Sequence, residues 1–229
     1  EMEPDKLVLL VEDDAALRAT LRAGLVAAGL RVAEAENAEV GLQQFGLRRP
    51  DLVVLDVALP DGDGFEVCRR IREGQAGPAT PVIMLTARGG FQDKETGFSA
   101  GADQYLVKPV RADELVLWAR ALLRRLALDR DEGDCLQADE LLIELDNHRV
   151  RWRELVIANL TVKEFDLLCL LVKRRPQVLG RKQILDVLWQ TITVDRVVDV
   201  HIGNLRRKLP PELADRIQSI PGRGYRFLD

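Results

Sequence analysis

The first half of the chain alternates short, unbroken apolar runs with longer segments in which apolar and polar residues are mixed. The apolar runs are Leu7–Val11, Leu52–Leu55, Val82–Leu85 and Tyr105–Val107, with a less continuous fifth run at Leu30–Glu34. Such runs are typical of strands that are buried on both faces of a parallel sheet. Strand–helix alternation produces right-handed βαβ units. The pattern therefore predicts an α/β fold, a doubly wound five-stranded parallel sheet that covers residues 5–124.

Helices are expected between these runs. Asp14 is a candidate cap for a helix over Ala15–Ala28, because its side chain can accept hydrogen bonds from free backbone N–H groups. Further helices are predicted at residues 38–48, 65–73, 93–100 and 113–126.

The second half of the chain has a different pattern. Leu136–Arg153 alternates apolar and polar residues, which predicts antiparallel hairpins. Capping signals and helical periodicity then predict three helices and a terminal hairpin, at residues 161–171, 183–189, 195–208 and 217–227. Residues 136–229 are therefore predicted to form a smaller α+β domain, and the charged segment 125–135 to be a linker.

Composition and cysteine content limit the class of protein. The 229 residues are 47% hydrophobic and 31% charged, which is typical of a soluble globular protein. No apolar stretch reaches the roughly 20 residues that a membrane span needs, and the N-terminus has no signal-type pattern. The three cysteines have no C-x-x-C spacing and are expected to be reduced. These features predict a cytoplasmic protein that does not act at a membrane.

The net charge of −4 conceals a basic stretch in the second half. Residues 173–226 contain 12 Lys or Arg and 5 Asp or Glu. The predicted helix at 195–208 has one apolar stripe, which consists of Val198, Ile202, Leu205 and Leu209. The opposite face carries Arg196, Val200, Gly203 and Arg207. Charge alone is also compatible with a solvated face, but a basic face opposite an apolar one suits a helix in the major groove of DNA.

Five polar residues follow the apolar runs of the first half directly. They are Glu12, Asp13, Asp56, Thr86 and Lys108. Because the carboxyl ends of parallel strands meet at one edge of a sheet, we expect these side chains to share one crevice. Like charges a few ångströms apart repel one another unless a cation lies among them. Oxygen ligands of this kind suit Mg²⁺, and the backbone carbonyl of Ala58 could add another oxygen.

Asp56 is the carboxylate that we expect to act as a nucleophile. A carboxylate can attack a phosphoryl group and form an aspartyl phosphate, whose oxygens Lys108 and Thr86 could bind. The Lys108–Pro109 bond is a candidate for the cis form. Hydrolases of the haloacid dehalogenase type have a second Asp two residues after the nucleophile as general acid–base, and here that position is Ala58. Asp56 is therefore interpreted as a switch rather than as a catalyst of many turnovers.

Five stretches of the first half form a recognisable set: Val11–Asp14, Leu55–Asp56, Leu59–Gly64, Leu85–Arg88 and Gly101–Pro109. Together they resemble the receiver domain of bacterial two-component response regulators. The resemblance implies that Asp56 accepts a phosphoryl group from a histidine kinase. It implies that Asp13, Asp56 and the Ala58 carbonyl bind Mg²⁺, with Glu12 acting through water. It also implies that Thr86 and Tyr105 report phosphorylation, the Thr86 hydroxyl by moving toward the phosphate and the Tyr105 ring by swinging inward.

A second set of stretches lies in residues 136–228: Leu160–Leu168, Val187–Trp189, Arg196–Ile202, Leu205–Leu209 and Gly222–Phe227. This set resembles the winged-helix output domain of the OmpR/PhoB-like transcription factors. The resemblance implies that the helix at 195–208 is the recognition helix and that Gly222–Gly224 is the tip of the wing. The residues expected to contact DNA are Arg196, Val200, Gly203, Asn204, Arg206, Arg207 and Arg223. We expect Asn204 to read an adenine edge and Val200 to pack on a thymine methyl group, whereas His201 fits a phosphate contact or helix packing equally well.

The face on which relatives pair their active receivers departs from the family pattern. The residues expected on it are Lys94, Asp103, Gln104, Glu114 and Trp118. Lys94 and Glu114 fit one ion pair, whereas Gln104 and Trp118 replace both halves of another. Burial of a Trp contributes more than an exposed ion pair, so the dimer is predicted to form through Trp118. The alternative is that Trp118 packs within its own chain.

Together these features predict a phosphorylation-controlled DNA-binding transcriptional regulator, not an enzyme. The expected cofactor is Mg²⁺, and the expected partners are a sensor histidine kinase, promoter DNA with tandem half-sites, and a second copy of the phosphorylated chain. The segment between Trp189 and Asp199, which in relatives can contact RNA polymerase, is shorter here than is common, so that contact stays open. The alternative is a phosphorylation-independent DNA-binding regulator whose receiver serves only for dimerisation.

Overall fold

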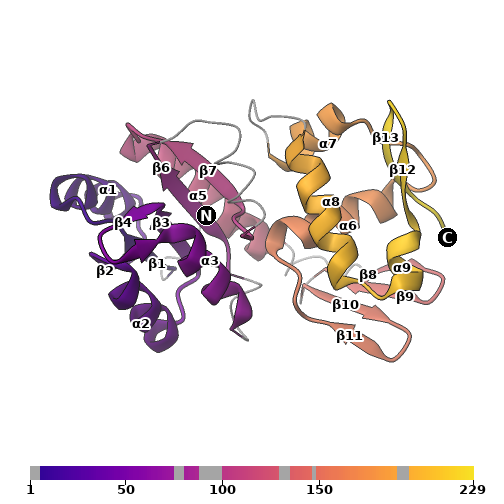
Figure 1. The fold of residues 1–229 in the computed structure, drawn as a ribbon, viewed down its shortest axis with the longest axis horizontal. Coiled ribbons are helices and arrows are strands. Elements are labelled where there is room, and N and C mark those ends of the chain that lie inside the picture. The colour runs from indigo at the N-terminus through magenta and orange to yellow at the C-terminus, as the bar shows by residue number, and fades with distance from the viewer. Residues whose placement is uncertain (1–5, 75–79, 88–99, 129–134, 146–147, 190–195) are drawn as a thin grey trace. The chain divides into compact units, whose positions relative to one another are not determined.

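The structure is a computed structural model that describes residues 6–74, 80–87, 100–128, 135–145, 148–189 and 196–229 (Figure 1). The chain divides into two compact units, Glu1–Leu126 and Ala127–Asp229. Each unit has its own set of buried apolar side chains.

A parallel sheet forms the centre of the first unit. Its strands lie in the order β2 (Arg31–Ala35), β1 (Leu7–Val11), β3 (Leu52–Asp56), β6 (Val82–Thr86) and β7 (Gln104–Val107). Every neighbouring pair of strands is parallel, so the predicted five-stranded doubly wound sheet is confirmed. The strand order reverses between β1 and β3, and open α/β sheets bind ligands beside the carboxyl ends of the strands at such a point.

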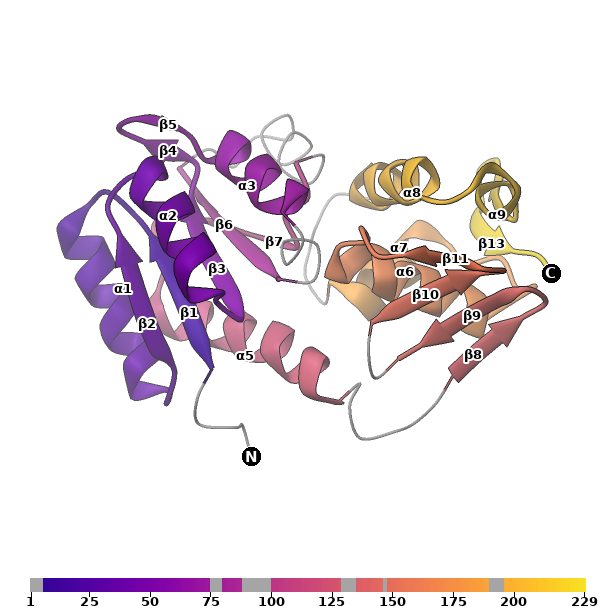
Figure 2. The same ribbon diagram turned by 90° about the horizontal axis from the view of Figure 1, so that it is seen from below.

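Helices cover both faces of this sheet (Figure 2). On one face, α1 (Ala15–Ala27) and α5 (Ala112–Leu128) pack on alternate strand residues such as Leu10, and together they form one buried apolar cluster. The other face is covered by α2 (Ala38–Arg48) and α3 (Gly64–Glu73). Side chains alternate between the two faces of a strand, and coverage of both faces explains why these strands are apolar without interruption.

Asp14 fixes the start of α1. Its carboxylate accepts hydrogen bonds from the backbone N–H groups of Leu17 and Ala16, at 2.9 and 2.8 Å. These two bonds hold the pKa of Asp14 below its ordinary value. The predicted cap of this helix is confirmed.

A short hairpin that we did not predict follows β3. Its strands are β4 (Ala58–Leu59) and β5 (Gly62–Asp63). The Asp61 carboxylate in its turn accepts hydrogen bonds from the N–H groups of Ala38 and Glu39, at 2.7 and 3.0 Å. Free N–H groups and the dipole at a helix N-terminus favour a negative charge, and these bonds lower the pKa of Asp61. The hairpin is thereby tied to the start of α2.

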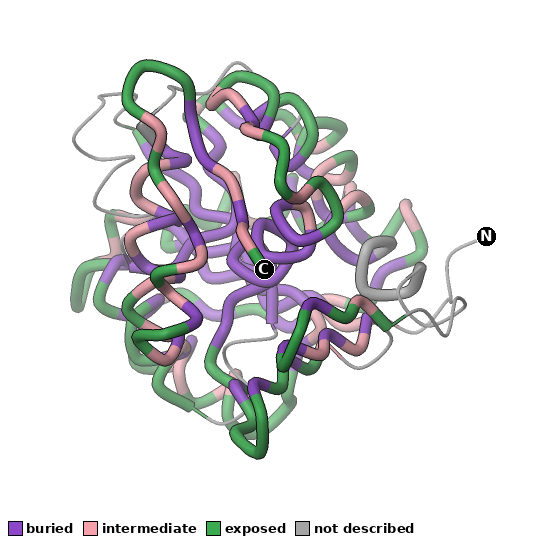
Figure 3. The backbone as a smooth tube through the Cα atoms, turned by 90° about the vertical axis from the view of Figure 1, so that its right-hand side faces the viewer, coloured by how far each residue is buried: buried purple, intermediate pink, exposed green. Residues whose placement is uncertain are grey.

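An antiparallel sheet begins the second unit. Its strands lie in the order β11 (Leu155–Ile157), β10 (Arg149–Trp152), β9 (Leu141–Glu144) and β8 (Cys135–Ala138). Exposed and buried residues alternate along β10, as expected for a sheet with one solvated face. Figure 3 shows where buried, partly buried and exposed residues lie along the backbone.

The remainder of the second unit is helical up to a terminal hairpin. The helices are α6 (Val162–Lys173), α7 (Arg181–Leu188), α8 (Arg196–Lys208) and α9 (Pro211–Asp215), and the hairpin consists of β12 (Ile217–Ile220) and β13 (Gly224–Phe227). Thr161 and Glu164 form the predicted capping box at the start of α6. The predicted apolar stripe of α8 is buried, which includes Val198, Ile202, Leu205 and Leu209.

Some element boundaries differ from the predictions. The helix α9 was not predicted; Pro211 starts it, because a proline at the first position of a helix lacks only an N–H that would be unpaired there. The helix α5 continues to Leu128, inside the predicted linker, since Leu and Ala favour helix. The predicted helix 93–100 falls almost entirely outside the described residues. No helix in the described part of the chain has the length and apolar character that a membrane crossing requires.

Candidate functional site

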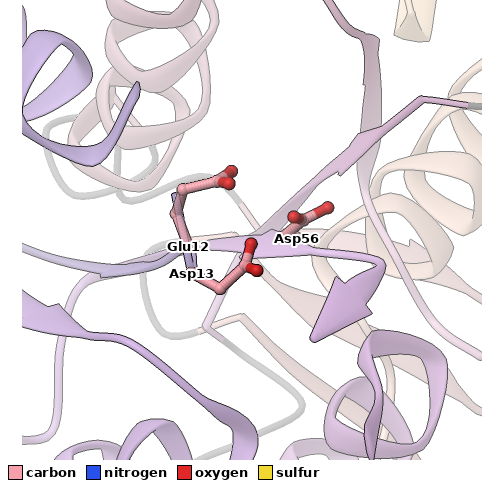
Figure 4. A group of neighbouring side chains, drawn as sticks. All are labelled: Glu12, Asp13 and Asp56. Atoms are coloured by element: carbon pink, nitrogen blue, oxygen red, sulfur yellow. The ribbon is translucent and has the colours of Figure 1, made fainter. Parts of the chain in front are cut away.

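Three carboxylates gather at the carboxyl ends of β1 and β3 (Figure 4). Carboxylate oxygens of Glu12, Asp13 and Asp56 lie within 4.8 Å of one another. Glu12 is 0% exposed and Asp56 is 2% exposed, whereas Asp13 is exposed. Three like charges at this separation repel one another unless a cation lies among them. The donor set consists only of carboxylate oxygens, which fits a hard divalent cation such as Mg²⁺.

Lys108 balances part of this negative charge. Its ammonium nitrogen lies 2.7 Å from an Asp56 oxygen and 2.8 Å from a Glu12 oxygen. Burial acts to lower the pKa of Lys108, but its hydrogen bonds to Asp56 and Glu12 outweigh that effect, so the pKa is raised. Burial raises the pKa of Glu12, and the nearby Asp56 charge adds to this effect although Lys108 opposes it. The Lys108–Pro109 peptide bond is cis, as predicted.

Thr86 and Tyr105 lie on the two strands nearest Lys108. Thr86 is the last residue of β6 and is buried, and its carbonyl accepts a hydrogen bond from the Lys108 N–H at 2.7 Å. The Tyr105 side chain is also buried, and its hydroxyl donates to the Met84 Sδ atom at 3.2 Å. The Tyr105 ring therefore lies inside this unit, and its response to phosphorylation stays a prediction.

Arg18 holds the backbone of the acidic residues, and we did not predict this role. Its guanidinium donates to the carbonyl oxygens of Glu12 and Asp13, at 2.6 and 3.1 Å. The only signal in the sequence is that a basic residue follows the Asp14 cap by one helical turn. Because its partners are backbone atoms, their identity cannot be read from side-chain types. The contact restricts where the two carboxylates can lie.

Gly64 packs directly on the backbone of Asp56. A Cβ atom at position 64 would lie 2.1 Å from the Asp56 carbonyl oxygen and 2.8 Å from the Cα atom of Val57. Nearby, the Ala58 N–H donates to the Asp56 carboxylate at 3.2 Å. The residues after Asp56 are therefore held closely against it, and no side chain fits at position 64.

Asp103 does not lie on an exposed face, and we correct its assignment to the dimer interface. Its side chain is fully buried. One carboxylate oxygen forms an ion pair with Arg72 at 2.7 Å and accepts a hydrogen bond from the Val82 N–H at 2.8 Å. These contacts join α3 to the sheet, so Asp103 has a structural role in this unit.

The other residues predicted for the dimer face differ in exposure. Glu114 is exposed and Gln104 is only 4% exposed. Trp118 is partly buried and packs against the apolar cluster of its own unit, which favours the alternative of intramolecular packing. Lys94 lies outside the described residues.

The residues of α8 predicted to contact DNA also differ in exposure. Arg207 is exposed, and Val200 and Gly203 are partly exposed. Asn204 is 5% exposed, and its side-chain oxygen accepts a hydrogen bond from Arg207. Asn204 can therefore read an adenine edge only if its side chain becomes more exposed. Arg196 begins α8, but its side chain lies outside the described part of the structure.

Arg206, which we expect to contact DNA, also contacts the terminal hairpin. Its guanidinium donates to the Ile217 carbonyl at 2.5 Å and to the Ser219 hydroxyl at 3.0 Å. Arg223, in the turn of the same hairpin, is exposed as expected. His201 is 0% exposed with its ring centroid 5.0 Å from that of Trp189, so of its two predicted roles the structure favours helix packing.

Two protein-family models match the chain. The response regulator receiver domain matches residues 8–120, and the C-terminal domain of transcriptional regulatory proteins matches residues 156–227. The transcriptional regulatory protein ResD of Bacillus subtilis is 38% identical to the chain, and the match covers 96% of this chain and 95% of ResD. The chain belongs to the OmpR/PhoB family of response regulators.

Further members of the OmpR/PhoB family match over nearly their whole lengths. The phosphate regulon transcriptional regulatory protein PhoB of Rhizobium meliloti is 38% identical, with 95% of this chain and 96% of PhoB covered. Among solved structures, the response regulator DrrB of Thermotoga maritima is 30% identical with a TM-score of 0.52, covering 98% of this chain and 99% of DrrB. ResD and PhoB are transcriptional regulatory proteins, in agreement with the prediction that the chain is not an enzyme. A receiver joined to a DNA-binding domain accounts for the acidic crevice and the basic helix in one chain.

Proposed function

We propose that phosphorylation of Asp56 controls DNA binding by this regulator. The observation that carries the proposal is the position of the Lys108 ammonium, 2.7 Å from Asp56 and 2.8 Å from Glu12 in the acidic crevice. An ammonium at this place can neutralise a phosphoryl oxygen on the acceptor carboxylate. The buried Thr86 hydroxyl at the end of the adjacent strand would donate to another phosphoryl oxygen.

The acidic residues would hold Mg²⁺. Asp13, Asp56 and the Ala58 carbonyl are the proposed ligands, and Glu12 acts through water. When bound, Mg²⁺ supplies positive charge to the phosphoryl oxygens. Support comes from the separation of the three carboxylates, whose oxygens lie within 4.8 Å of one another.

The phosphoryl donor would be a phosphohistidine of a sensor histidine kinase. A bond forms between phosphorus and an Asp56 carboxylate oxygen while the phosphorus–nitrogen bond breaks. The electron pair of that bond stays on the imidazole nitrogen, which takes up a proton from water. Because Ala58 has no acid–base group two residues after Asp56, that position cannot activate water for hydrolysis. The phosphorylated chain would therefore last long enough to act as a signal.

DNA would be bound by the second unit. The exposed side chain of Arg207 and the partly exposed Val200 and Gly203 form the surface of α8 that would face the major groove. Arg223 in the hairpin turn would contact a phosphate. Phosphorylated receivers would pair, so that two α8 helices reach tandem half-sites. Linking two modules in this way raises the effective concentration of the second one.

The test compares the wild-type chain with Asp56→Asn. With Mg²⁺ and a small acyl phosphate, mass spectrometry should show one added phosphoryl group on the wild type and none on Asp56→Asn. Asp63→Asn is the matched control, because Asp63 is a nearby exposed carboxylate that caps α3, and Asn caps a helix as well. A duplex that the wild-type chain selects from a randomised pool should bind more tightly after phosphorylation. An equal response of Asp56→Asn to the donor would support the phosphorylation-independent alternative instead.

A further inference from the structure

Three side chains join α8 to the terminal hairpin and to the start of α7. The Asp199 carboxylate in the first turn of α8 accepts a hydrogen bond from Arg181 Nε at 2.7 Å and one from the Tyr225 hydroxyl at 2.5 Å. Arg181 also donates to the Tyr225 hydroxyl at 3.3 Å, and its guanidinium carbon lies 5.0 Å from the centroid of the Tyr225 ring. These contacts form a closed triangle, called here the Arg181–Asp199–Tyr225 cluster.

The backbone around Tyr225 is held at the same place. The N–H groups of Leu179 and Tyr225 each donate to the carbonyl of the other residue, at 2.8 and 2.9 Å. Gly224 has a φ of +140°, and a Cβ atom there would lie 1.9 Å from the Leu179 carbonyl oxygen. The strand β13 is therefore pressed against the segment that leads into α7, and the position of Tyr225 is well defined.

A second tie lies near the other end of α8. Arg206 donates to the Ile217 carbonyl and to the Ser219 hydroxyl of β12, at 2.5 and 3.0 Å. The hairpin is thus fastened to α8 at both Asp199 and Arg206, almost two turns apart on the helix. Contacts at two separated points restrict the rotation of the hairpin relative to the helix. A contact at one point would leave that rotation free.

The negative charge of Asp199 is unfavourable for DNA binding at this place on α8, so another role must explain it. Its side chain is 40% exposed on the helix proposed to face DNA, and a carboxylate there is repelled by phosphates. Arg181 neutralises that charge, and Tyr225 gives it a second partner. A carboxylate near a helix N-terminus also stabilises the helix, but that role requires neither Arg181 nor Tyr225.

We propose that the Arg181–Asp199–Tyr225 cluster is a positioning device that sets the hairpin against α8, so that Arg207 and Arg223 reach DNA together. The inference rests on the proposed DNA-binding role of α8 and deepens it. Arg181, Asp199 and Tyr225 are positioning residues, because they act through the orientation of the hairpin.

The first test is Asp199→Asn, for which the loss of charge and the loss of positioning should change DNA affinity in opposite directions. Removing a negative charge from a DNA-facing helix should strengthen binding to a polyanion, whereas losing the cluster should weaken it. We expect the Kd for the duplex selected by the wild-type chain to rise about 5- to 10-fold, the size expected for the net loss of one hydrogen bond. Asp186→Asn is the matched control, because Asp186 is an exposed carboxylate on α7. The Kd of Asp186→Asn for the same duplex should equal that of the wild type or be lower.

The second test is a double-mutant cycle between Tyr225→Phe and Arg223→Ala. The Phe variant keeps the buried ring and removes only the hydroxyl, so it tests the cluster even if Asp199→Asn does not fold. Arg223→Ala should raise the Kd by about fivefold in the wild type and by less than about twofold in the Phe variant. A purely structural role of the hydroxyl would lower the midpoint of thermal unfolding and leave the two effects additive.

The outcomes separate this inference from the function on which it rests. A wild-type chain that selects no duplex overturns both. A wild-type chain that binds DNA, with Asp199→Asn and Tyr225→Phe binding equally well or more tightly, overturns the positioning role alone. Additive effects of Tyr225→Phe and Arg223→Ala overturn it as well.

Discussion

The ammonium nitrogen of Lys108 lies 2.7 Å from a carboxylate oxygen of Asp56, the carboxylate that we propose as the phosphoryl acceptor. The same nitrogen lies 2.8 Å from Glu12. Both carboxylates are buried, so Lys108 contributes to the stability of the fold as well as to the proposed chemistry. These two contributions can be measured separately.

Lys108→Met should lower the free energy of unfolding by about 3 kcal/mol at pH 7, because it leaves buried carboxylates without their cation. The loss should be smaller toward pH 5. Burial raises the pKa of Glu12, and a carboxyl group with a raised folded-state pKa stabilises the fold below its unfolded pKa and loses that effect as pH rises through the folded value. Without Lys108 the pKa of Glu12 rises further. As the pH falls, Glu12 is therefore protonated at a higher pH in the variant than in the wild type, and its unpaired buried charge is removed.

Urea unfolding at the two pH values measures this difference between Lys108→Met and the wild type. Lys173→Met is the control, because Lys173 is an exposed lysine at the end of α6. Its effect should be small at both pH values. Equal losses at pH 5 and pH 7 for Lys108→Met would contradict the role assigned to Glu12.

Asp13→Asn should stabilise the chain in the absence of metal and weaken Mg²⁺ binding. It relieves repulsion among carboxylates within 4.8 Å of one another, and it removes one proposed ligand. We expect the Mg²⁺ affinity to fall at least about tenfold. The midpoint of thermal unfolding, measured at increasing Mg²⁺ concentration, reports both effects. Asp14→Asn is the control; it keeps the helix cap, and a similar loss of Mg²⁺ affinity in it would argue against a specific site.

Trp118→Ala should lower the free energy of unfolding by about 2 kcal/mol, because the side chain packs partly into the apolar cluster of its own unit. Leu117→Ala is the neighbouring control, since Leu117 is 65% exposed and should matter little for stability. Sedimentation of the phosphorylated variants then tests the proposed dimer face. Because Trp118 packs within its own unit, we expect unchanged dimerisation of Trp118→Ala, and weaker dimerisation would place Trp118 in the dimer face.

Of the three thiols, one should react in the folded chain. Cys135 is exposed, whereas Cys68 and Cys169 are buried. Burial raises the pKa of the Cys68 thiol to about 11, so little reactive thiolate is present near pH 8. A maleimide should modify one thiol quickly in the native chain and all three after unfolding, and Cys135→Ser should abolish the fast reaction. Rapid labelling of Cys68 in the native chain would be inconsistent with its burial.

Much of the first unit could be predicted because its strands are buried on both faces and therefore read as unbroken apolar runs. The turn between β4 and β5 could not, since Pro60 and two glycines in that segment indicate a chain reversal without indicating pairing. The helix α9 was missed for a related reason. A proline that ends one helix can begin the next, and local sequence does not distinguish the two.

The acidic crevice could also be predicted, because residues at the carboxyl ends of parallel strands must meet. The structure brings Glu12, Asp13, Asp56 and Lys108 together in this way. Arg18 was missed because its partners are carbonyl oxygens.

Tertiary context explains where the prediction of other site residues failed or was incomplete. Asp103 was placed on the surface because sequence does not reveal that Arg72 reaches it from α3. A helical wheel contains no information about the hairpin that Arg206 contacts, so this contact was not predicted.

A methyl group at position 64 would clash with the backbone of Asp56, the proposed phosphoacceptor, since the added carbon would come within 2.1 Å of the Asp56 carbonyl oxygen. Every single-base missense change of a glycine codon introduces a residue with a side chain. No such substitution at position 64 therefore avoids this clash. A saturation library selected for signalling should return glycine alone at this codon, while the exposed Asp63 beside it accepts other helix-capping residues. We therefore expect position 64 of the receiver to accept only glycine, whereas the adjacent surface position 63 should accept substitutions.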